Sequence, residues 1–203
     1  MTFRFAFPAK IAALIAVGLA AGGCSVWGTA AGAGAIGATA AQTEKGFRRS
    51  MADTEIRIAI NDLWLKADEE MFRKVNLQVQ EGRVLLTGNV RLPEQRVEAV
   101  RLAWQPPGVR EVINEITVDD TSGLGNFARD TWISTELRST LLFDQDVSSI
   151  DYSIETVNQV IYLMGVAQSQ AELDRVIGHA KSIAYVRRVI SYVLLEDDPA
   201  RHT

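Results

Sequence analysis

The feature that most limits the fold of this chain is an internal repeat. When the sequence is compared with itself at an offset of 77 residues, its apolar positions coincide without a gap over about 53–119 and 130–196. Leu86, for example, falls on Leu163. A unit of this length is too long for one turn of a solenoid, whose repeats are about 20–50 residues long. The sequence therefore predicts two tandem copies of one small domain.

Each copy predicts the same order of elements. Apolar residues recur at helical spacing through Ile56, Ile60 and Trp64, which predicts that the copy opens with an amphipathic helix. The elements expected after it are a strand over 75–79, a strand over 84–90, a helix over 93–103 and a strand over 109–118. This αββαβ order predicts an α+β fold in which two helices cover one face of a three-stranded mixed sheet.

Three sequence motifs of the first copy are typical of a known family. They are the turn glycine Gly82, the run VLLTG at 84–88 and the ending GVxxVxNxI at 108–116. On these motifs the chain resembles the BON domain family, and the resemblance covers both copies. The second copy departs from them at 158–159, where Asn-Gln replaces Glu-Gly, and at 184–185, where Ala-Tyr replaces Pro-Gly.

The N-terminus has the pattern of a secretory signal peptide. Arg4 and Lys10 are the only charges before Glu44, and the apolar run over 11–20 follows them. A basic start and a short apolar stretch are typical of signal peptides, whereas a membrane span needs about 20 apolar residues. Because the Ala- and Gly-rich sequence continues past Cys24, an uncleaved anchor remains the alternative.

The apolar run ends in Ala-Gly-Gly-Cys at 21–24, which resembles a bacterial lipobox with Ala21 where Leu is usual. The resemblance implies that Cys24 is lipidated and becomes the mature N-terminus, and cleavage without lipidation is the alternative. Ser25 after the cysteine implies, by the same resemblance, an anchor in the outer membrane. The Gly- and Ala-rich residues 24–50 are expected to form a flexible tether.

The whole chain has a recognisable layout. We expect a signal peptide in 1–23, a lipidated N-terminus and tether in 24–50, BON domains in 51–120 and 130–196, a linker in 121–129 and a tail in 197–203. This layout resembles that of the dual-BON outer-membrane lipoproteins of the DolP type. The resemblance implies a lipid-anchored protein on the periplasmic face of the outer membrane, which binds anionic phospholipid through its second BON domain and supports envelope integrity.

Composition disfavours most other classes of function. The net charge is −4 and becomes −6 when residues 1–23 are removed, so the chain lacks the basic field of a nucleic-acid binder. One cysteine and two histidines leave little material for a Cys-cluster zinc site or a Ser-His-Asp triad. Paired acids at 68–70 and 144–146 are expected in solvated loops, and His179 is expected at the surface. We therefore expect neither an enzyme nor a cofactor.

The segment 130–143 places its core residues and its aromatic residues on different sides of a helix. At 100° per residue, Ile133 and Leu141 belong to the stripe expected to be buried, whereas Trp132 and Phe143 lie well off it. A surface aromatic suits a membrane interface, where an apolar ring and a polar edge are both satisfied. The helix therefore carries the candidate lipid-binding surface.

The two copies differ at these aromatic positions. The first copy has Glu55 and Lys66 where the second has the two aromatic residues, so the fold itself does not require them. The family resemblance implies that Trp132 is the interfacial anchor, and the helical wheel adds Arg138 and Phe143 as further phospholipid contacts.

Two aspartates are expected to begin the opening helices. Asp53 and Asp130 are both suited to the N-cap position. The start of the second-copy helix is then expected to offer backbone N–H groups to a phosphate headgroup, with Arg129 and Arg138 nearby and Asp130 competing for the same donors.

Two alternatives remain open at this point. In the first, Trp132 packs against the other copy or against the segment 123–127 instead of entering a membrane. In the second, the protein is an adaptor that grips an outer-membrane assembly or a peptidoglycan-associated partner through its sheet face.

Overall fold

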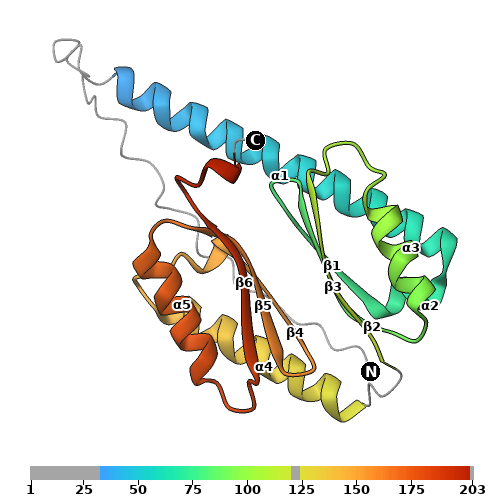
Figure 1. The fold of residues 1–203 in the computed structure, drawn as a ribbon. Helices are drawn as coiled ribbons and strands as arrows, with labels where there is room; N and C mark the ends of the chain where they lie inside the picture. The colour runs from blue at the N-terminus through green and yellow to red at the C-terminus, as the bar shows by residue number, and fades with distance from the viewer. Residues whose placement is uncertain (1–32, 120–123, 202–203) are drawn as a thin grey trace, which may run out of the picture. The chain divides into compact units, whose positions relative to one another are not determined.

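The computed structural model describes residues 33–119 and 124–201 (Figure 1). The predicted signal peptide and Cys24 lie outside these residues. In the first copy the elements are α1 (Ala33–Ala67), α2 (Glu69–Lys74), β1 (Val75–Gln80), β2 (Arg83–Val90), α3 (Pro93–Ala103) and β3 (Glu111–Val118). In the second they are α4 (Leu124–Phe143), the 3-10 turn η1 (Ser149–Asp151), β4 (Tyr152–Val157), β5 (Val160–Ala167), α5 (Gln170–Ser182), β6 (Arg188–Leu195) and a closing turn η2 (Pro199–Arg201).

The two sheets have the same topology and the same register. In each, the first two strands pair antiparallel and the central strand pairs parallel with the third, in the orders β1-β2-β3 and β4-β5-β6. Val75 faces Gly88 in the first sheet, and Tyr152 faces Gly165 at the corresponding place in the second. The predicted αββαβ order with mixed sheets is confirmed, and the first copy adds the short helix α2.

Two glycines on the central strands allow a close approach of the backbone. Gly88 and Gly165 have φ of 124° and 155°, and a Cβ built on them would lie 2.2 Å from the Lys74 carbonyl oxygen and 2.1 Å from the Asp151 carbonyl oxygen. No other residue fits such contacts. This explains why both copies keep glycine at the end of the motif VLLTG and at its counterpart.

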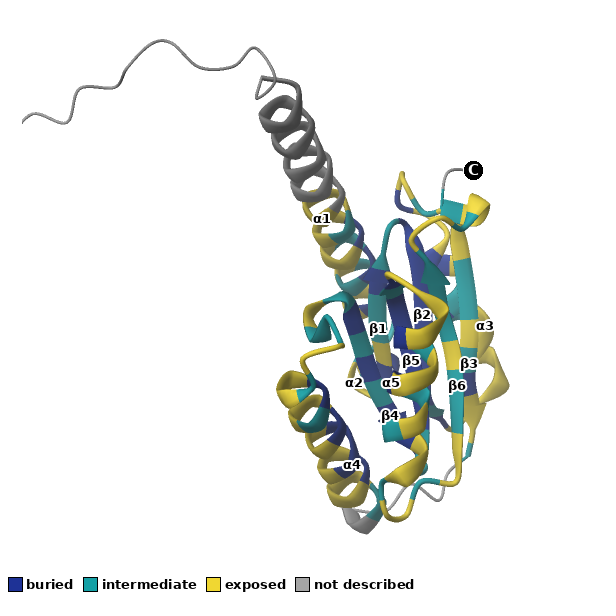
Figure 2. Cartoon of the chain, turned by 90° about the vertical axis from the view of Figure 1, so that its left-hand side faces the viewer, coloured by how far each residue is buried: buried dark blue, intermediate teal, exposed yellow. Residues whose placement is uncertain are grey.

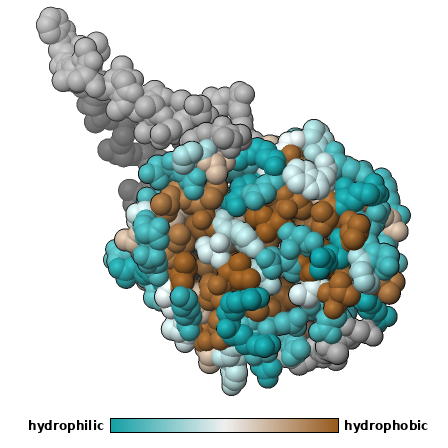
Figure 3. All heavy atoms as spheres, in the orientation of Figure 1, coloured by the Kyte–Doolittle hydropathy of each residue, from teal (hydrophilic) through white to brown (hydrophobic). Residues whose placement is uncertain are grey.

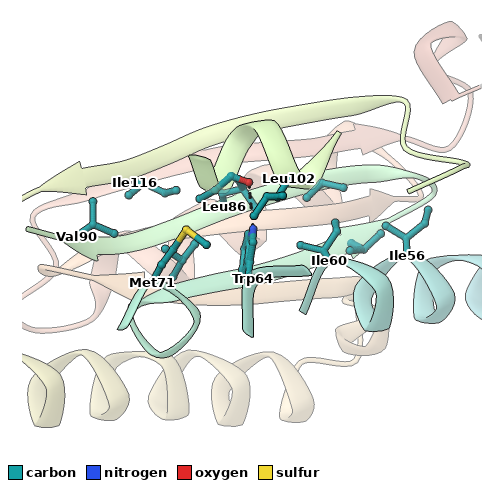
Figure 4. Close-up of a cluster of buried hydrophobic side chains, with 13 residues drawn as sticks. Ile56, Ile60, Trp64, Met71, Leu86, Val90, Leu102 and Ile116 are labelled. Carbon is teal, nitrogen blue, oxygen red and sulfur yellow. Dashed lines mark hydrogen bonds between the residues drawn. The ribbon is translucent and has the colours of Figure 1, made fainter. Parts of the chain in front are cut away.

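The core of each sheet is built by the helix that precedes its strands in the sequence and by the helix between its last two strands. In the first copy α1 and α3 pack on one face, with Trp64 between Ile60 and Met71 (Figure 4). The Trp64 indole Nε1 donates to the Ala99 carbonyl oxygen at 3.1 Å, so the buried ring satisfies its one polar atom. In the second copy the predicted stripe is confirmed, because Ile133, Leu137 and Leu141 are fully buried.

The opening helices begin earlier than the sequence analysis expected. α1 starts at Ala33 and α4 at Leu124, so the predicted tether 24–50 is helical from Ala33 on, and the predicted linker 121–129 is helical from Leu124 on. Alanine has the highest helix propensity, and the Ala-rich stretch before residue 50 continues the helix despite its glycines. Residues 41–203 form one compact unit that contains both cores.

Asp53 and Asp130 therefore lie inside helices, and their prediction as N-caps is wrong. The Asp53 carboxylate accepts hydrogen bonds from the backbone N–H groups of Glu81 and Gly82, both at 2.8 Å. Asp130 accepts from the corresponding turn, residues 158–159, also at 2.8 Å. The turn residues have positive φ, so each aspartate holds a strained hairpin turn against its helix. The predicted phosphate site at a helix start near Asp130 is absent for the same reason.

The acids at 68–70 are also placed differently from the prediction. Asp68 is the N-cap of α2, and its carboxylate accepts from the Met71 N–H at 3.0 Å and from Gln95 Nε2 at 2.9 Å. The hydrogen bond from Gln95, followed by that from Met71, lowers the pKa of Asp68. This segment is a helix that covers the core through Met71, and not a solvated loop.

The second faces of the two sheets pack against each other. Leu85 and Ile113 of the first sheet contact an apolar cluster of the second that includes Tyr162 and Met164. The central strands β2 and β5 are consequently buried along most of their length (Figure 2). A three-stranded sheet with helices on one face only would expose its other face, so each copy supplies the cover that the other lacks.

Equivalent positions of the two copies meet across this interface. Gln78 Nε2 donates to Glu155 at 3.4 Å, and the Tyr192 hydroxyl donates to Glu115. Both pairs are 77 residues apart, as expected when two copies face each other about an approximate two-fold axis. At both positions one copy has a carboxylate and the other an uncharged donor, so like charges do not meet.

The hydrogen bonds from the hairpin turn at 81–82 to Asp53, which we call the hairpin clasp, lead to a test in the first domain. Asp53→Ala is expected to lower the free energy of unfolding of residues 41–203 by about 2–3 kcal/mol, because two turn N–H groups lose a charged acceptor. Urea denaturation followed by circular dichroism measures this. The control is Asp62→Ala on the same helix, which removes only an exposed pair with Lys66 and is expected to change stability by less than about 0.5 kcal/mol. Equal losses for both variants would contradict the clasp.

Candidate functional site

The second domain carries an exposed aromatic group that joins two of its elements. Trp132 on α4 is 45% exposed, and its ring meets that of Tyr185, from the loop between α5 and β6, edge to face at 6.0 Å. The Arg129 guanidinium carbon lies 5.3 Å from the centre of the Tyr185 ring, within the range of a cation–π contact. We call these three residues the aromatic cluster. It lies at the surface, and Trp132 is not enclosed between the two domains.

A second exposed apolar group lies at the end of the same helix. Phe143 is 81% exposed, and Leu142 and Ile150 are also exposed. Eleven residues separate Trp132 from Phe143, which returns them to nearly the same side of α4 at about 16 Å along its axis. The structure thus places the two predicted aromatic contacts on one side of one helix. On the face that Figure 3 shows, apolar and hydrophilic residues are interspersed.

The aromatic residues at four positions are a property of the second copy. The residues of the first copy that correspond to Phe127, Trp132, Phe143 and Tyr185 are Ser50, Glu55, Lys66 and Gly108. The exposed large apolar residues of the first copy are mostly aliphatic, with Trp104 as the one aromatic among those described. Two copies with the same core therefore present different surfaces.

Arg138 lies apart from these aromatics. Its Nη2 donates to the Ile154 carbonyl oxygen at 2.5 Å, so the side chain crosses from α4 to strand β4. It also faces a cleft of about 930 Å³ whose lining comes from both domains. The structure brings together Trp132 and Phe143 of the predicted site, whereas Arg138 is engaged elsewhere on the helix.

The cleft itself is polar and its charges are balanced. Acidic and basic residues line it in equal number, and they are Glu69, Glu70, Asp130, Glu155, Arg73, Lys74, Arg91 and Arg138. Glu155 accepts from Asn76 at 3.0 Å and from Gln78 at 3.4 Å, both in the other domain. Burial raises the pKa of the Glu155 carboxyl, and the charge of Arg138 partly opposes that shift. The polar wall of the cleft thus holds the two domains together.

The acids at 144–146 lie in the loop after α4, as expected, and ion pairs with His179 and Arg175 join this loop to α5. Asp146 is exposed, whereas Asp144 is largely covered, so His179 is a paired residue at the edge of the surface. His179 Nε2 lies 2.6 Å from an Asp144 carboxylate oxygen, and Arg175 lies 2.9 Å from Asp146. The hydrogen bond from His179 lowers the pKa of Asp144. Within 33–119 and 124–201, no group of three or more His, Cys, Asp or Glu side chains is arranged to hold a metal ion.

Two members of the aromatic cluster, Arg129 and Tyr185, were not predicted as site residues from the sequence. Arg129 was noted only as a nearby cation, and Tyr185 only as a departure from the Pro-Gly of the first copy. That departure was the available signal, because a bulky residue stands where the other copy has a turn glycine. In the described part of the chain, no helix is both long enough and apolar enough to span a bilayer.

Comparison with known proteins supports the resemblance that the motifs indicated. The profile of the BON domain family matches residues 52–120 and 129–196. A protein from the gshII 5′ region of Anaplasma centrale is 44% identical over 143 residues, which cover 68% of this chain and 95% of that protein. Outer membrane lipoprotein DolP of Haemophilus influenzae is 29% identical, covering 89% of this chain and 93% of its own. The osmotically inducible protein Y of Escherichia coli is 29% identical, covering 68% and 70%.

The half-buried carboxyl of Glu155 leads to a test by pH. A carboxyl whose folded pKa is raised stabilises the fold fully below its unfolded value, about 4.3, and this contribution is lost as the pH rises through the folded pKa. The free energy of unfolding of residues 41–203 is therefore expected to fall less between pH 4 and 8 in Glu155→Gln than in the wild type.

The companion variant is Gln78→Glu, which sets a second carboxylate opposite Glu155 and is expected to steepen the loss at rising pH. Denaturant titrations at several pH values measure all three proteins. Parallel curves for the three would contradict a raised pKa for the half-buried Glu155 carboxyl at this interface.

Proposed function

Because the chain belongs to the BON domain family and folds as two BON domains, we propose that it is a cell-envelope protein that docks on anionic phospholipid through its second domain. The observation that carries the proposal is the exposure of Trp132 and Phe143 on the same side of α4, at positions where the first copy has charged residues. The relative DolP of H. influenzae, which matches most of this chain, is an outer membrane lipoprotein.

The chemistry of these side chains suits the headgroup region of a bilayer. Tryptophan concentrates at membrane interfaces because its ring is apolar and its N–H is polar. Moving an exposed Phe side chain into an apolar environment stabilises by about 1.5–3 kcal/mol. Arg129 adds a cation beside Trp132, in a domain that is otherwise acidic, with five basic and eight acidic residues over 130–195. In this proposal Arg138 secures α4 to β4 and thereby fixes the direction of the aromatic residues.

A lipid on Cys24 is the second attachment in this proposal. Cys24 follows the apolar run and precedes the first residue of α1 by nine positions. One acyl chain alone gives only marginal membrane binding, whereas the two or three chains of a lipidated lipobox cysteine hold a protein firmly. A lipidated N-terminus would keep the second domain close to the outer membrane, and such a protein is suited to supporting the integrity of the envelope.

The structure bears on the alternative role as a protein adaptor. That hypothesis placed the binding surface on the sheet face, where Leu85, Tyr162 and Met164 are buried between the domains. A partner that used this face would have to separate the two sheets. A protein partner would therefore have to bind the helices, the loops or the sheet edges rather than the sheet face.

Vesicle flotation of residues 41–203 tests the docking. Trp132→Glu is expected to reduce the bound fraction by about tenfold or more, because a carboxylate replaces the ring at the interface, while the melting temperature stays within about 2 °C of wild type. The control is Trp104→Glu, which changes a tryptophan of similar exposure (50%) in the first domain and is expected to leave flotation unchanged. Equal binding by wild type and Trp132→Glu would refute the proposal, as would a large stability loss in that variant.

Metabolic labelling tests the anchor. The full-length chain is expected to incorporate a radiolabelled fatty acid, and Cys24→Ala is expected to lose the label and to leave the outer-membrane fraction. Since the chain has one cysteine, no other thiol can take the lipid. Label retained by Cys24→Ala, or absent from both proteins, would show that this cysteine is not the attachment point.

A further inference from the structure

Tyr185 occupies a backbone conformation that tyrosine rarely adopts. Its φ is 70°, and the corresponding residue of the first copy is Gly108, with φ of 92°. Left-handed backbone is unfavourable for a residue with a Cβ and easy for glycine. The first copy shows that this fold makes the same connection with a glycine, so tyrosine is not needed to build the turn.

The Tyr185 ring is not used to fill a core either. It is 64% exposed, and its ring contacts are Trp132 and Arg129 on another element. The other described non-glycine residues with positive φ lie in the hairpin turns at 81 and 158–159, where Asp53 or Asp130 holds their N–H groups. A strained residue with an exposed ring at the candidate site points to a role at that site.

Arg129 supplies the charge of this group. It is exposed, and among residues 33–119 and 124–201 it forms no salt bridge. Its guanidinium lies over the Tyr185 ring, and because the residue is exposed its N–H groups are accessible to a phosphate. Because the rest of the domain is acidic, it is this local cation that would attract α4 to an anionic membrane surface.

We propose that Tyr185 and Arg129 complete the phospholipid-docking site, which rests on the function proposed above. Tyr185 enters the interface beside Trp132 from the loop between α5 and β6, and its ring orients the Arg129 guanidinium toward the phosphodiester of an anionic headgroup. The site is thus built by α4 and by the loop between α5 and β6, and Trp132 and Arg129 have separate roles in it. Trp132 provides insertion, and Arg129 selects negative charge.

Tyr185→Gly tests the role of the strained ring, since it restores the residue of the first copy. We expect residues 41–203 carrying it to melt within about 2 °C of wild type or higher, because relief of the strain offsets the lost ring contact. We expect its affinity for vesicles of phosphatidylethanolamine with phosphatidylglycerol to fall roughly fivefold or more. A melting temperature well below that of wild type would assign Tyr185 a structural role and overturn this part of the proposal.

Arg129→Gln tests the selection of charge. We expect it to bind phosphatidylglycerol-containing vesicles no better than vesicles of phosphatidylcholine, and we expect Arg129→Lys to restore part of the preference. The control for net charge is Arg57→Gln on the exposed side of α1, which is expected to keep the wild-type preference. An equal loss in Arg57→Gln and Arg129→Gln would show that only total charge matters, and would overturn the assignment.

The two levels of the proposal fail in different ways. If wild type does not bind vesicles, the proposed function itself is refuted. If wild type binds and Trp132→Glu does not, while Tyr185→Gly and Arg129→Gln behave as wild type, the docking stands and the role of Tyr185 and Arg129 is refuted.

Discussion

The packing of the two sheets against each other is the contact on which the rest of this structure depends. Each three-stranded sheet has helices on one face only, and its other face gains cover from the second copy through residues such as Leu85 and Met164. With both sheet faces used, the surface left to interact with anything else consists of helices, loops and the edge strands such as β3 and β6. The exposed aromatic residues lie on the helical and loop part of that surface.

Duplication supplied that cover, and divergence then made the two copies complementary. Where equivalent positions meet, Gln78 faces Glu155 and Glu115 faces Tyr192, so a neutral donor opposes each carboxylate. Identical copies would have placed like groups opposite each other. The same divergence gave the second copy aromatic residues where the first has polar residues or glycine, which separates a domain that completes the fold from one that carries the candidate site.

Much of the fold could be predicted from the sequence because periodicity reports burial. The offset of 77 revealed the duplication, and the helical spacing of Ile133, Leu137 and Leu141 located a stripe that is fully buried. Helix starts were predicted less well. Asp53 was read as an N-cap, since a cap and a mid-helix aspartate that binds a distant turn look alike in one dimension. The partner that decides between them lies 28 residues further on.

The sequence by itself determined the duplicated αββαβ architecture, the family, and the position of Trp132 and Phe143 off the buried stripe of their helix, because each of these depends on local spacing and on comparison of one copy with the other. The structure decided that Trp132 is not covered by the other domain. Only the tertiary structure decided which residues stand beside these aromatic residues. Arg138, on the same helix, is drawn away to the Ile154 carbonyl, whereas Tyr185, which is 53 positions from Trp132, meets it edge to face. Contacts between distant segments depend on how helices and loops pack on the sheet, and that information is not contained in the spacing of residues along one helix.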